Sequence, residues 1–374
     1  MGFSKKLIHN RIIVIIIGFF SLTLLLFYYH MTSKIEVLKT KNNKLEHLMA
    51  NSQGASLSAN TENDSIENLF NDDDEQLTHT SAERQSDMND AVIVYNRVPK
   101  TGSTSFMGIA YDLCKPNKFN VLHLNTSKNS HLMSLDDQRR FVYNITGWSQ
   151  KKPSLFHGHI AFVDFSKFGV KQKPIYINLI RDPLDRLVSY YYFLRYGDDF
   201  RPHVVRKRKG NKVTFDECVQ RKERDCDPNN MWLQVPFFCG QAFECWRPGS
   251  RWALDEAKHN LINNYLLVGV TEQMAEFVTL LEVVLPRFFT GATQLFINGT
   301  KSHLRKTYNK QQPSSESIAK LQQSEVWRLE QEFYDFTVAQ FDFMKRQTFG
   351  AVDAGGDMRP RGQQYFYEKI RPRV

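Results

Sequence analysis

The order of apolar and polar positions over residues 91–349 predicts strands and helices that follow each other along the chain. The β-branched run that begins at Val92 and the apolar run Pro174–Ile180 are both typical of buried strands. A third strand is predicted over Tyr265–Val270, between helices over 255–263 and 272–285. Alternating helices and strands are what a parallel sheet with helical crossovers requires, so the sequence predicts an α/β fold.

Apolar residues at helical spacing predict one more long amphipathic helix near the end of this region. Its predicted core positions are Val326, Leu329, Phe333, Phe336 and either Gln340 or Phe343. A cluster of aromatic residues precedes it, and core packing is a better interpretation of that cluster than sugar-stacking platforms. The cluster consists of Trp232, Phe237, Phe238, Trp246 and Trp252.

The first 90 residues have a different pattern. Residues 12–29 form an uncharged run of 18 residues preceded by basic residues within 1–11, which predicts a transmembrane signal anchor with a cytoplasmic tail. A removed signal peptide is the alternative, but no small-residue cleavage site follows the run. Residues 30–90 are predicted to form a luminal stem. Within this stem, 35–49 is either a short coiled coil or a solvated helix, and the polar remainder is a disordered acidic linker.

Charge follows the same division. Residues 1–50 carry seven basic and two acidic side chains, and residues 51–90 carry ten acidic side chains and one Arg. Since the whole chain has a formal charge of +9, residues 91–374 carry about +13. A basic folded domain suits a polyanion, and charge alone admits both nucleic acid and sulfated polysaccharide. A luminal location excludes nucleic acid.

Cysteine spacing agrees with a lumen. Cys218 and Cys226 are eight positions apart, Cys239 and Cys245 are six apart, and neither spacing is that of a zinc ribbon. In an oxidising compartment these cysteines are expected to form local disulfides, with Cys114 left as a buried helix thiol; in the cytosol all five would be free. Glycosylation acceptor motifs occur at Asn125, Asn144 and Asn298.

The stretch after the first strand contains a lysine, a glycine and several hydroxyl side chains. Residues 99–105 connect that strand to a predicted helix from Ser105 to about Cys114. Backbone N–H groups and the helix dipole favour an anion at such a turn, and Lys100 adds a positive charge. The G-x-x-x-x-G-K-[ST] motif is absent, so a nucleotide kinase loop is disfavoured. An ordinary solvated turn is the other interpretation.

The segment Pro99-Lys100-Thr101-Gly102-Ser103-Thr104-Ser105 resembles the 5′-phosphosulfate loop of sulfotransferases that use 3′-phosphoadenosine 5′-phosphosulfate (PAPS). With its flanking residues 95–98 and 109–114, it resembles the heparan sulfate 2-O-sulfotransferase family in particular. The resemblance implies a sulfotransferase fold, with a central parallel sheet, flanking helices and a P-loop-like PAPS site, here preceded by a transmembrane helix. It also implies that the residues from Lys100 to Ser105 hold the 5′-phosphosulfate.

A second anion-binding motif follows the strand that ends at Ile180. Arg181 ends the strand, Pro183 suits a helix start, and Ser189 lies two turns into that helix. Arg181 and Ser189 could therefore meet at one phosphate, and an arginine can bind it in bidentate fashion. By itself the motif is also compatible with a salt-bridged helix cap. In the resembled family it binds the 3′-phosphate.

The sequence His157-Gly158-His159 places two imidazoles on one side of an extended chain. A metal site lacks an obvious third ligand, and a structural histidine pair is the plain alternative. An imidazole can also accept a proton from a sugar hydroxyl near neutral pH. The resemblance implies that His159 is the general base and His157 its partner, with Lys100 stabilising the leaving phosphate oxygen.

The resemblance extends to the C-terminus. It implies a loop that closes over the cofactor, formed by Ser302, His303, Leu304, Arg305, Lys306 and Thr307. Substrate contacts are implied for Arg97, Tyr111, His123, Lys128, Tyr190, Arg206 and Arg305, although neighbouring bases leave the register of Arg206 uncertain. A catalytic domain over 91–349 is then followed by a linker and tail over 350–374, which the resemblance implies to be inter-subunit in a homotrimer.

The sequence thus predicts a single-pass type II Golgi membrane protein with a luminal catalytic domain. The expected reaction is transfer of a sulfuryl group from PAPS to the 2-hydroxyl of iduronate, less often glucuronate, in heparan sulfate, without a metal. A uronyl 2-O-sulfotransferase that acts on dermatan or chondroitin sulfate is one alternative. A luminal heparan-binding protein without catalysis is another.

Overall fold

A computed structural model of the chain describes residues 88–299 and 306–349. The predicted anchor, the C-terminal tail and all of the stem except residues 88–90 lie outside these residues. Within the described residues, no single helix has the length and apolar composition to cross a membrane. The bent pair 271–284 and 286–298, whose axes differ by 117°, meets that test only when its two helices are taken together.

Within the described ranges, five parallel strands form one sheet in the order β2-β3-β1-β4-β5. The strands are β1 (Val92–Asn96), β2 (Asn120–Leu124), β3 (Ser154–Gly158), β4 (Ile175–Ile180) and β5 (Tyr265–Val270). The three strands predicted from apolar runs are therefore confirmed, and so is the parallel sheet. β1 and β4 are neighbours at the centre, which places the two predicted anion-binding turns at the same edge of the sheet.

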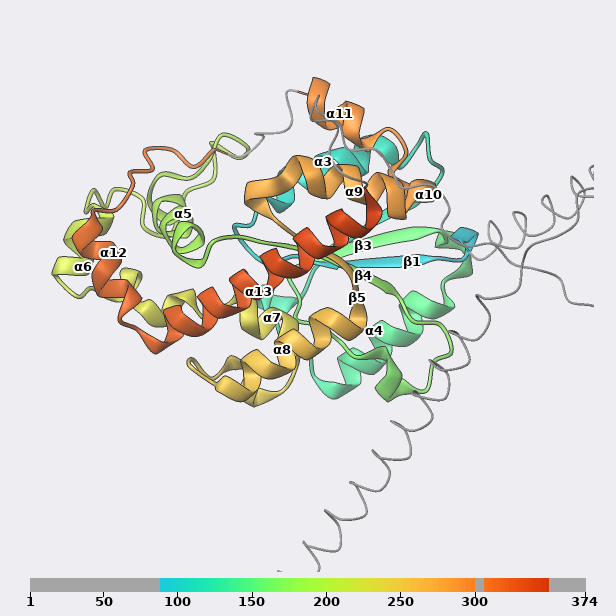
Figure 1. Ribbon diagram of the computed structural model, residues 1–374, viewed down its shortest axis with the longest axis horizontal. Coiled ribbons are helices and arrows are strands. Elements are labelled where there is room, and N and C mark those ends of the chain that lie inside the picture. Colours follow the sequence, from blue (N-terminus) through green and yellow to red (C-terminus); the bar gives the residue numbers. More distant parts are fainter. Residues whose placement is uncertain (1–87, 300–305, 350–374) are drawn as a thin grey trace, which may run out of the picture. The chain divides into compact units, whose positions relative to one another are not determined.

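Helices cover both faces of the sheet (Figure 1). The first six are α3 (Ser103–Leu113), α4 (Leu135–Gly147), α5 (Pro183–Tyr196), α6 (Phe215–Gln220), α7 (Gln234–Cys239) and α8 (Arg251–Asn264). The others are α9 (Met274–Val284), α10 (Pro286–Phe289), α11 (Ala292–Asn298), α12 (Ser315–Gln322) and α13 (Glu325–Thr348). Short 3₁₀ turns lie at 127–129, 149–151, 165–168, 224–226, 228–231, 243–246 and 271–273.

Helix α3 and helices α9 and α10 lie over one face of the sheet, while α4, α7 and α8 lie over the other (Figure 1). Phe106 of α3 is fully buried, and its ring centroid lies 5.1 Å from that of Tyr95 and 5.4 Å from that of Phe277. These edge-to-face contacts join α3, β1 and α9 into one core. Since β1 and α3 are packed this firmly, the loop between them starts and ends at fixed points.

Two helices begin earlier than the apolar pattern predicts, because of local capping. α3 starts at Ser103, where Gly102 in a left-handed conformation caps the helix. α8 starts at Arg251, since the Ser250 side chain accepts a hydrogen bond from the backbone N–H of Ala253. In contrast, α5 begins at Pro183 as predicted, with Asp182 as its N-cap.

Three predicted core positions need correction. Phe343 is 48% exposed, because the buried stripe of α13 continues from Phe333 in steps of four through Thr337 to Phe341. Trp252 is 49% exposed in the first turn of α8. Cys114 is half-buried and follows the last residue of α3, so it is not a buried helix thiol.

The structure contains both predicted local disulfides, Cys218–Cys226 and Cys239–Cys245. The second closes the turn between α7 and the 3₁₀ segment Phe243–Trp246. Trp246 lies immediately after it, and its indole N–H donates to the Gly240 carbonyl at 3.0 Å. This hydrogen bond and the disulfide both join the start of the loop to its end.

Candidate active site

The loop between β1 and α3 needs glycine at position 102. Its φ is +73°, and a Cβ there would lie 2.8 Å from Met274 Cε and 3.2 Å from Thr271 Cγ2. The left-handed backbone is strained for any residue with a Cβ, and a Cβ would also force the end of the Met274 side chain to move. The turn brings the N-terminus of α3, with N–H groups that have no partner within the helix, to the edge of the sheet.

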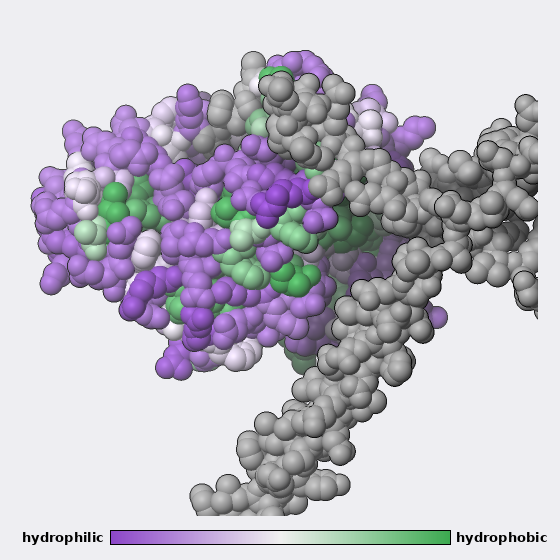
Figure 2. Space-filling model, viewed as in Figure 1, coloured by the Kyte–Doolittle hydropathy of each residue, from purple (hydrophilic) through white to green (hydrophobic). Residues whose placement is uncertain are grey.

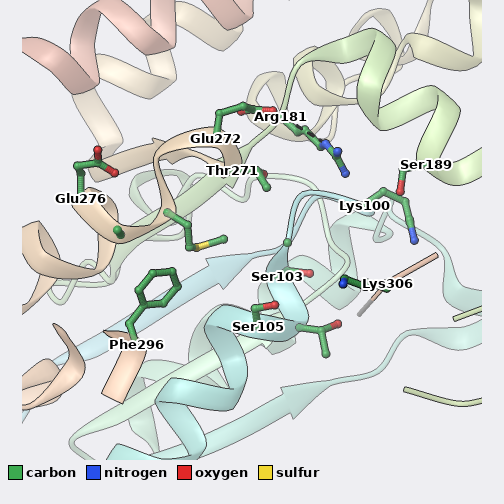
Figure 3. Close-up of a pocket in the computed structure, with 14 residues that line it drawn as sticks. Lys100, Ser103, Ser105, Arg181, Ser189, Thr271, Glu272, Glu276, Phe296 and Lys306 are labelled. Carbon is green, nitrogen blue, oxygen red and sulfur yellow. Dashed lines mark ion pairs between the residues drawn. The ribbon is translucent and has the colours of Figure 1, made fainter. Parts of the chain in front are cut away.

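A cavity of about 450 Å³ opens in front of this turn. Its walls include the predicted residues Lys100, Gly102, Ser103, Thr104, Ser105, Arg181, Ser189 and Lys306 (Figure 3). Lys100, Arg181 and Ser189 lie toward one end, and Phe296 of α11 lies across the pocket from them (Figure 3). The two anion-binding motifs found in the sequence therefore face a single cavity. We call this the donor cavity.

Thr101 is the exception in the loop. Its side chain is fully buried, and its hydroxyl donates to the carbonyl of Val98 at 3.0 Å. This hydrogen bond fixes the loop from inside. The Thr101 side chain does not line the donor cavity.

Arg181 is held by a residue that the sequence reasoning missed. The Arg181 backbone N–H donates to Gln234 Oε1 at 2.9 Å, and Gln234 Nε2 donates to the Arg181 carbonyl at 2.8 Å. Gln234 is fully buried at the start of α7. Its amide therefore satisfies both backbone groups of Arg181 at the point where the strand ends. The guanidinium pairs with Asp185 at 3.0 Å.

Lys100 is fixed by contacts with segments far away in the sequence. Its Nζ donates to Thr307 Oγ1 at 3.2 Å and lies 4.3 Å from the centroid of the Phe193 ring. Arg206 contacts the same ring, with its Cζ 4.3 Å from the centroid, and pairs with the buried Asp198 at 3.3 Å. These contacts bring Thr307, at the end of the predicted cofactor loop, and Arg206 next to Lys100.

A second cavity, of about 380 Å³, adjoins the donor cavity, and Thr104 lines both. Its walls include Arg97, Tyr111, His123, Asn125, Asn129, His157, His159, Phe200 and Arg201. Five of these were predicted as base, partner or substrate contacts. We call this the acceptor cleft. Parallel pairing of β2 with β3 sets His123 opposite His157, and their rings stack with centroids 4.9 Å apart.

Arg97 decides which nitrogen is protonated in both histidines of the motif. Its Nη1 lies 3.0 Å from His157 Nδ1, and because a guanidinium can only donate, Nδ1 is the acceptor. In the neutral ring His157 Nε2 then carries the proton and donates to Tyr111 Oη at 2.8 Å. Burial, followed by the charge of Arg97, lowers the pKa of His157 to about 3. Both nitrogens of His157 are therefore engaged.

His159 has the opposite arrangement. Its Nδ1 lies 2.8 Å from the carbonyl oxygen of Arg97, which can only accept, so Nδ1 carries the proton. In the neutral ring Nε2 keeps its lone pair. Burial, followed by the charge of Arg97, lowers the pKa of His159 to about 4. Near neutral pH the ring is therefore an uncharged proton acceptor on the wall of the acceptor cleft.

The other predicted residues lie elsewhere or cannot be placed. Arg206, Lys128 and Tyr190 line neither cavity within the described residues, whereas Arg201, which was not predicted, lines the acceptor cleft. Ser302, His303, Leu304 and Arg305 lie outside the described residues. Asn125, Asn144 and Asn298 are all exposed. Among the described residues, no group of three or more His, Cys, Asp or Glu side chains could hold a metal ion.

Comparison with known proteins shows to which family the chain belongs. A sequence profile described as the sulfotransferase family matches residues 86–337. Human heparan sulfate 2-O-sulfotransferase 1 is 60% identical over 284 residues, which covers 76% of this chain and 79% of the human protein. The chain belongs to the heparan sulfate 2-O-sulfotransferase family. Both cavities lie between residues 97 and 306, inside the span that the profile matches.

Members of the heparan sulfate 2-O-sulfotransferase family from distant animals are equally similar. The chicken heparan sulfate 2-O-sulfotransferase 1 is 59% identical over 285 residues and covers 76% of this chain and 80% of its own. The Drosophila melanogaster heparin sulfate O-sulfotransferase is 59% identical over 285 residues, with 75% and 79% covered. Mouse sulfotransferase SULT7A1, solved with PAP, is 13% identical with a TM-score of 0.32, covering 74% of this chain and 93% of its own.

Proposed function

We propose that this protein transfers a sulfuryl group from PAPS to the 2-hydroxyl of iduronate, and less often of glucuronate, in heparan sulfate. The observation that carries the proposal is that the donor cavity and the acceptor cleft adjoin at Thr104, which lines both. On one side lies a cavity with two anion-binding motifs, and on the other a cleft whose base, His159, has its proton on the nitrogen that bonds Arg97. The names of the relatives support the choice of polymer.

The residues of the donor cavity fit PAPS. Its volume of about 450 Å³ lies within the range of small-molecule sites, roughly 300–1,000 Å³. One end carries Lys100, Ser103 and the α3 N-terminus for one anionic group, with Arg181 and Ser189 for a second. The other end carries the ring of Phe296, on which the adenine of a nucleotide could stack. PAPS carries the matching groups, namely a phosphosulfate, a 3′-phosphate and an adenine.

When bound, PAPS supplies a sulfuryl group on a good leaving group, so the protein needs to position both substrates and manage charge. His159 Nε2 would take the proton of the 2-hydroxyl as the new S–O bond forms. The old S–O bond breaks, and its electron pair stays on the 5′-phosphate oxygen, where Lys100 stabilises the negative charge. Arg97, Tyr111 and His123 would orient the uronate in the acceptor cleft.

The acceptor is expected to be a polyanion. Arg97 and Arg201 line the cleft and suit sulfate and carboxylate groups. The described residues present a mostly hydrophilic face with smaller apolar areas (Figure 2). A dermatan- or chondroitin-specific enzyme would share this chemistry, so the polymer is decided by assay.

The test is transfer of labelled sulfate from PAPS to 2-O-desulfated heparan sulfate, with dermatan sulfate as competitor and disaccharide analysis of the product. We expect 2-O-sulfated uronate from heparan sulfate. The His159→Ala variant should lose transfer by about 10²–10⁴-fold, the usual contribution of a general base. Retention on a heparin column should not change. Preference for dermatan sulfate would overturn the choice of polymer, and full activity of the variant would exclude His159 as the base.

We also propose that the catalytic domain is luminal, in a type II Golgi membrane protein that forms a homotrimer through its C-terminal tail. The anchor pattern at 12–29, the two disulfides and the exposed sequon asparagines support the luminal location. The trimer is supported by the family resemblance of the tail. Glycosylation at Asn144 and resistance of the catalytic domain to protease added on the cytosolic side would test the luminal location. Sedimentation of the purified protein would test the trimer.

A further inference from the structure

The proposed base lies on a segment that has just left the sheet. β3 ends at Gly158, so the peptide groups from His159 onward have no partner strand to fix them. The ring of His159 is fixed by the Arg97 carbonyl, but the direction of its Cα–Cβ bond depends on the backbone. One distant residue holds that backbone in place by donating one hydrogen bond to it and accepting another from it.

That residue is His131, which lies between β2 and α4. Its Nδ1 is 2.9 Å from the carbonyl oxygen of His159, so Nδ1 is the donor, since a carbonyl can only accept. The backbone N–H of Ala161 donates to the His131 carbonyl, also at 2.9 Å. His131 therefore contacts the chain on both sides of residue 160. It lines neither the donor cavity nor the acceptor cleft.

The His131 ring is itself held against the disulfide loop. It stacks on the Trp246 ring with centroids 5.8 Å apart and planes at 19°, and it packs on Phe237 at 4.9 Å. Gln241, inside the loop closed by Cys239–Cys245, accepts from the Met133 N–H at 2.8 Å and donates to the Ala161 carbonyl at 3.0 Å. Phe237 and Trp246, which flank the disulfide loop, thus hold the His131 ring, and Gln241 inside the loop holds the segment that follows the base.

We propose that His131 is a positioning residue for the base: its Nδ1–H fixes the His159 peptide and, through it, the place of His159 Nε2 in the acceptor cleft. The inference rests on the proposed function, because it assigns His131 a role in the same transfer. The disulfide loop supplies the rigid surface on which His131 acts. His131 does not touch the reacting atoms.

Two substitutions separate the hydrogen bond from the packing. His131→Phe keeps an aromatic ring for Trp246 and Phe237 but has no donor. His131→Asn loses the ring but keeps an N–H the same number of bonds from the backbone. His259→Phe, at an exposed position of α8, is the matched control for a histidine-to-phenylalanine change.

We expect His131→Phe to lower kcat for sulfuryl transfer by about tenfold to a hundredfold, the usual cost of a misplaced catalytic group. The KM for PAPS and the affinity for PAP should not change, because the donor cavity is intact. His131→Asn should retain most of kcat, and His259→Phe all of it. Wild-type kcat in His131→Phe, or an equal loss in His131→Asn, would overturn the proposal.

Imidazole ¹⁵N NMR gives a readout that does not depend on activity, with the His159 signals identified by their absence in His159→Ala. We expect wild-type His159 to hold its proton on Nδ1 through the bond to the Arg97 carbonyl. In His131→Phe we expect a mixture of tautomers, because the loosened His159 backbone no longer keeps the ring in place for that bond. An unchanged His159 spectrum in that variant would also overturn the proposal. If the wild-type protein transferred no sulfuryl group, the proposed function would fail, and the NMR comparison would still decide the role of His131.

Discussion

The donor cavity and the acceptor cleft hold their side chains by different means. In the donor cavity, backbone geometry dominates: a left-handed glycine, a helix N-terminus and a glutamine that pairs with both peptide groups of Arg181. In the acceptor cleft, rings fix one another, since His157 contacts Arg97, Tyr111 and His123. The difference suits the two tasks. A constant nucleotide needs a fixed cradle, whereas a general base needs a defined protonation state.

Acid is expected to change the free energy of unfolding with opposite sign through two sets of groups. These are the histidines of the acceptor cleft and Glu330, which bonds the backbone on either side of Gln234. The pKa values of His157 and His159 are lowered from 6.5 to about 3 and about 4. The unfolded chain therefore binds more protons below pH 6.5, so the stability from these neutral rings is full above pH 6.5 and is lost as pH falls toward 3. With about 1.4 kcal/mol per pKa unit, the full loss is roughly 5 kcal/mol for His157 and roughly 3 kcal/mol for His159.

Glu330 of α13 acts in the other direction. It accepts hydrogen bonds from the N–H groups of Leu233 and Val235 on either side of Gln234. Burial raises the pKa of Glu330 from 4.5 to about 7. The folded chain binds more protons here, so this contribution is full below pH 4.5 and is lost as pH rises through 7. Chemical denaturation from pH 4 to 8 should show a weaker acid loss in His157→Gln and a weaker alkaline loss in Glu330→Gln. Curves parallel to wild type would contradict the assignment.

A smaller effect, on nucleotide affinity, is expected when only the backbone support of the donor cavity is removed. Gln234→Met removes both hydrogen bonds to the Arg181 backbone while keeping the side-chain length. PAP affinity, measured by calorimetry, should fall about tenfold, the equivalent of about 1.4 kcal/mol for unsatisfied buried groups. The KM for heparan sulfate should not change. Gln331→Met on α13, whose amide bonds Asp335, is the control. Equal loss of acceptor affinity would show that the two cavities are not held separately.

The smallest effect concerns Tyr111, whose hydroxyl oxygen accepts a hydrogen bond from His157 Nε2–H. Tyr111→Phe leaves His157 Nε2–H without this acceptor, so the ring is less firmly oriented. Because one neutral hydrogen bond contributes about 1 kcal/mol, kcat for transfer should fall roughly fivefold, with PAP affinity unchanged. Tyr143→Phe, at an exposed position of α4, serves as the control. An unchanged kcat would mean that the Tyr111 hydroxyl does not help to orient His157.

The sequence predicted those parts of the site whose residues are close together in the chain. The loop over 99–105, the motif at 181–189 and the pair His157 and His159 each combine a strand end with a distinctive set of residue types, and the structure places all three around adjoining cavities. Gln234 and His131 were not predicted. Gln234 bonds the backbone of Arg181, 53 residues away, and His131 bonds that of His159, 28 residues away. Such contacts leave no periodic pattern in the sequence.

Arg206 shows a different limit. Several basic residues lie close to Arg206 in the sequence, among them Arg201 and Arg208, and residue type alone does not show which of them contacts the substrate. Folding separates them, because Arg206 pairs with the buried Asp198 and packs on Phe193, while Arg201 lines the acceptor cleft. The helix starts at 103 and 251 were missed for a related reason, since a left-handed glycine or a serine cap is decided by one residue. The role of Arg206 in binding substrate stays a prediction.

Thr104 lines both cavities, so its short side chain lies at the boundary between the proposed sites of the two reactants. A change at this position cannot be confined to one substrate: a bulkier residue would push the nucleotide and the sugar apart together. Such a variant is expected to bind each partner and yet leave them unreacted. This makes position 104 a natural choice for trapping the complete ternary complex.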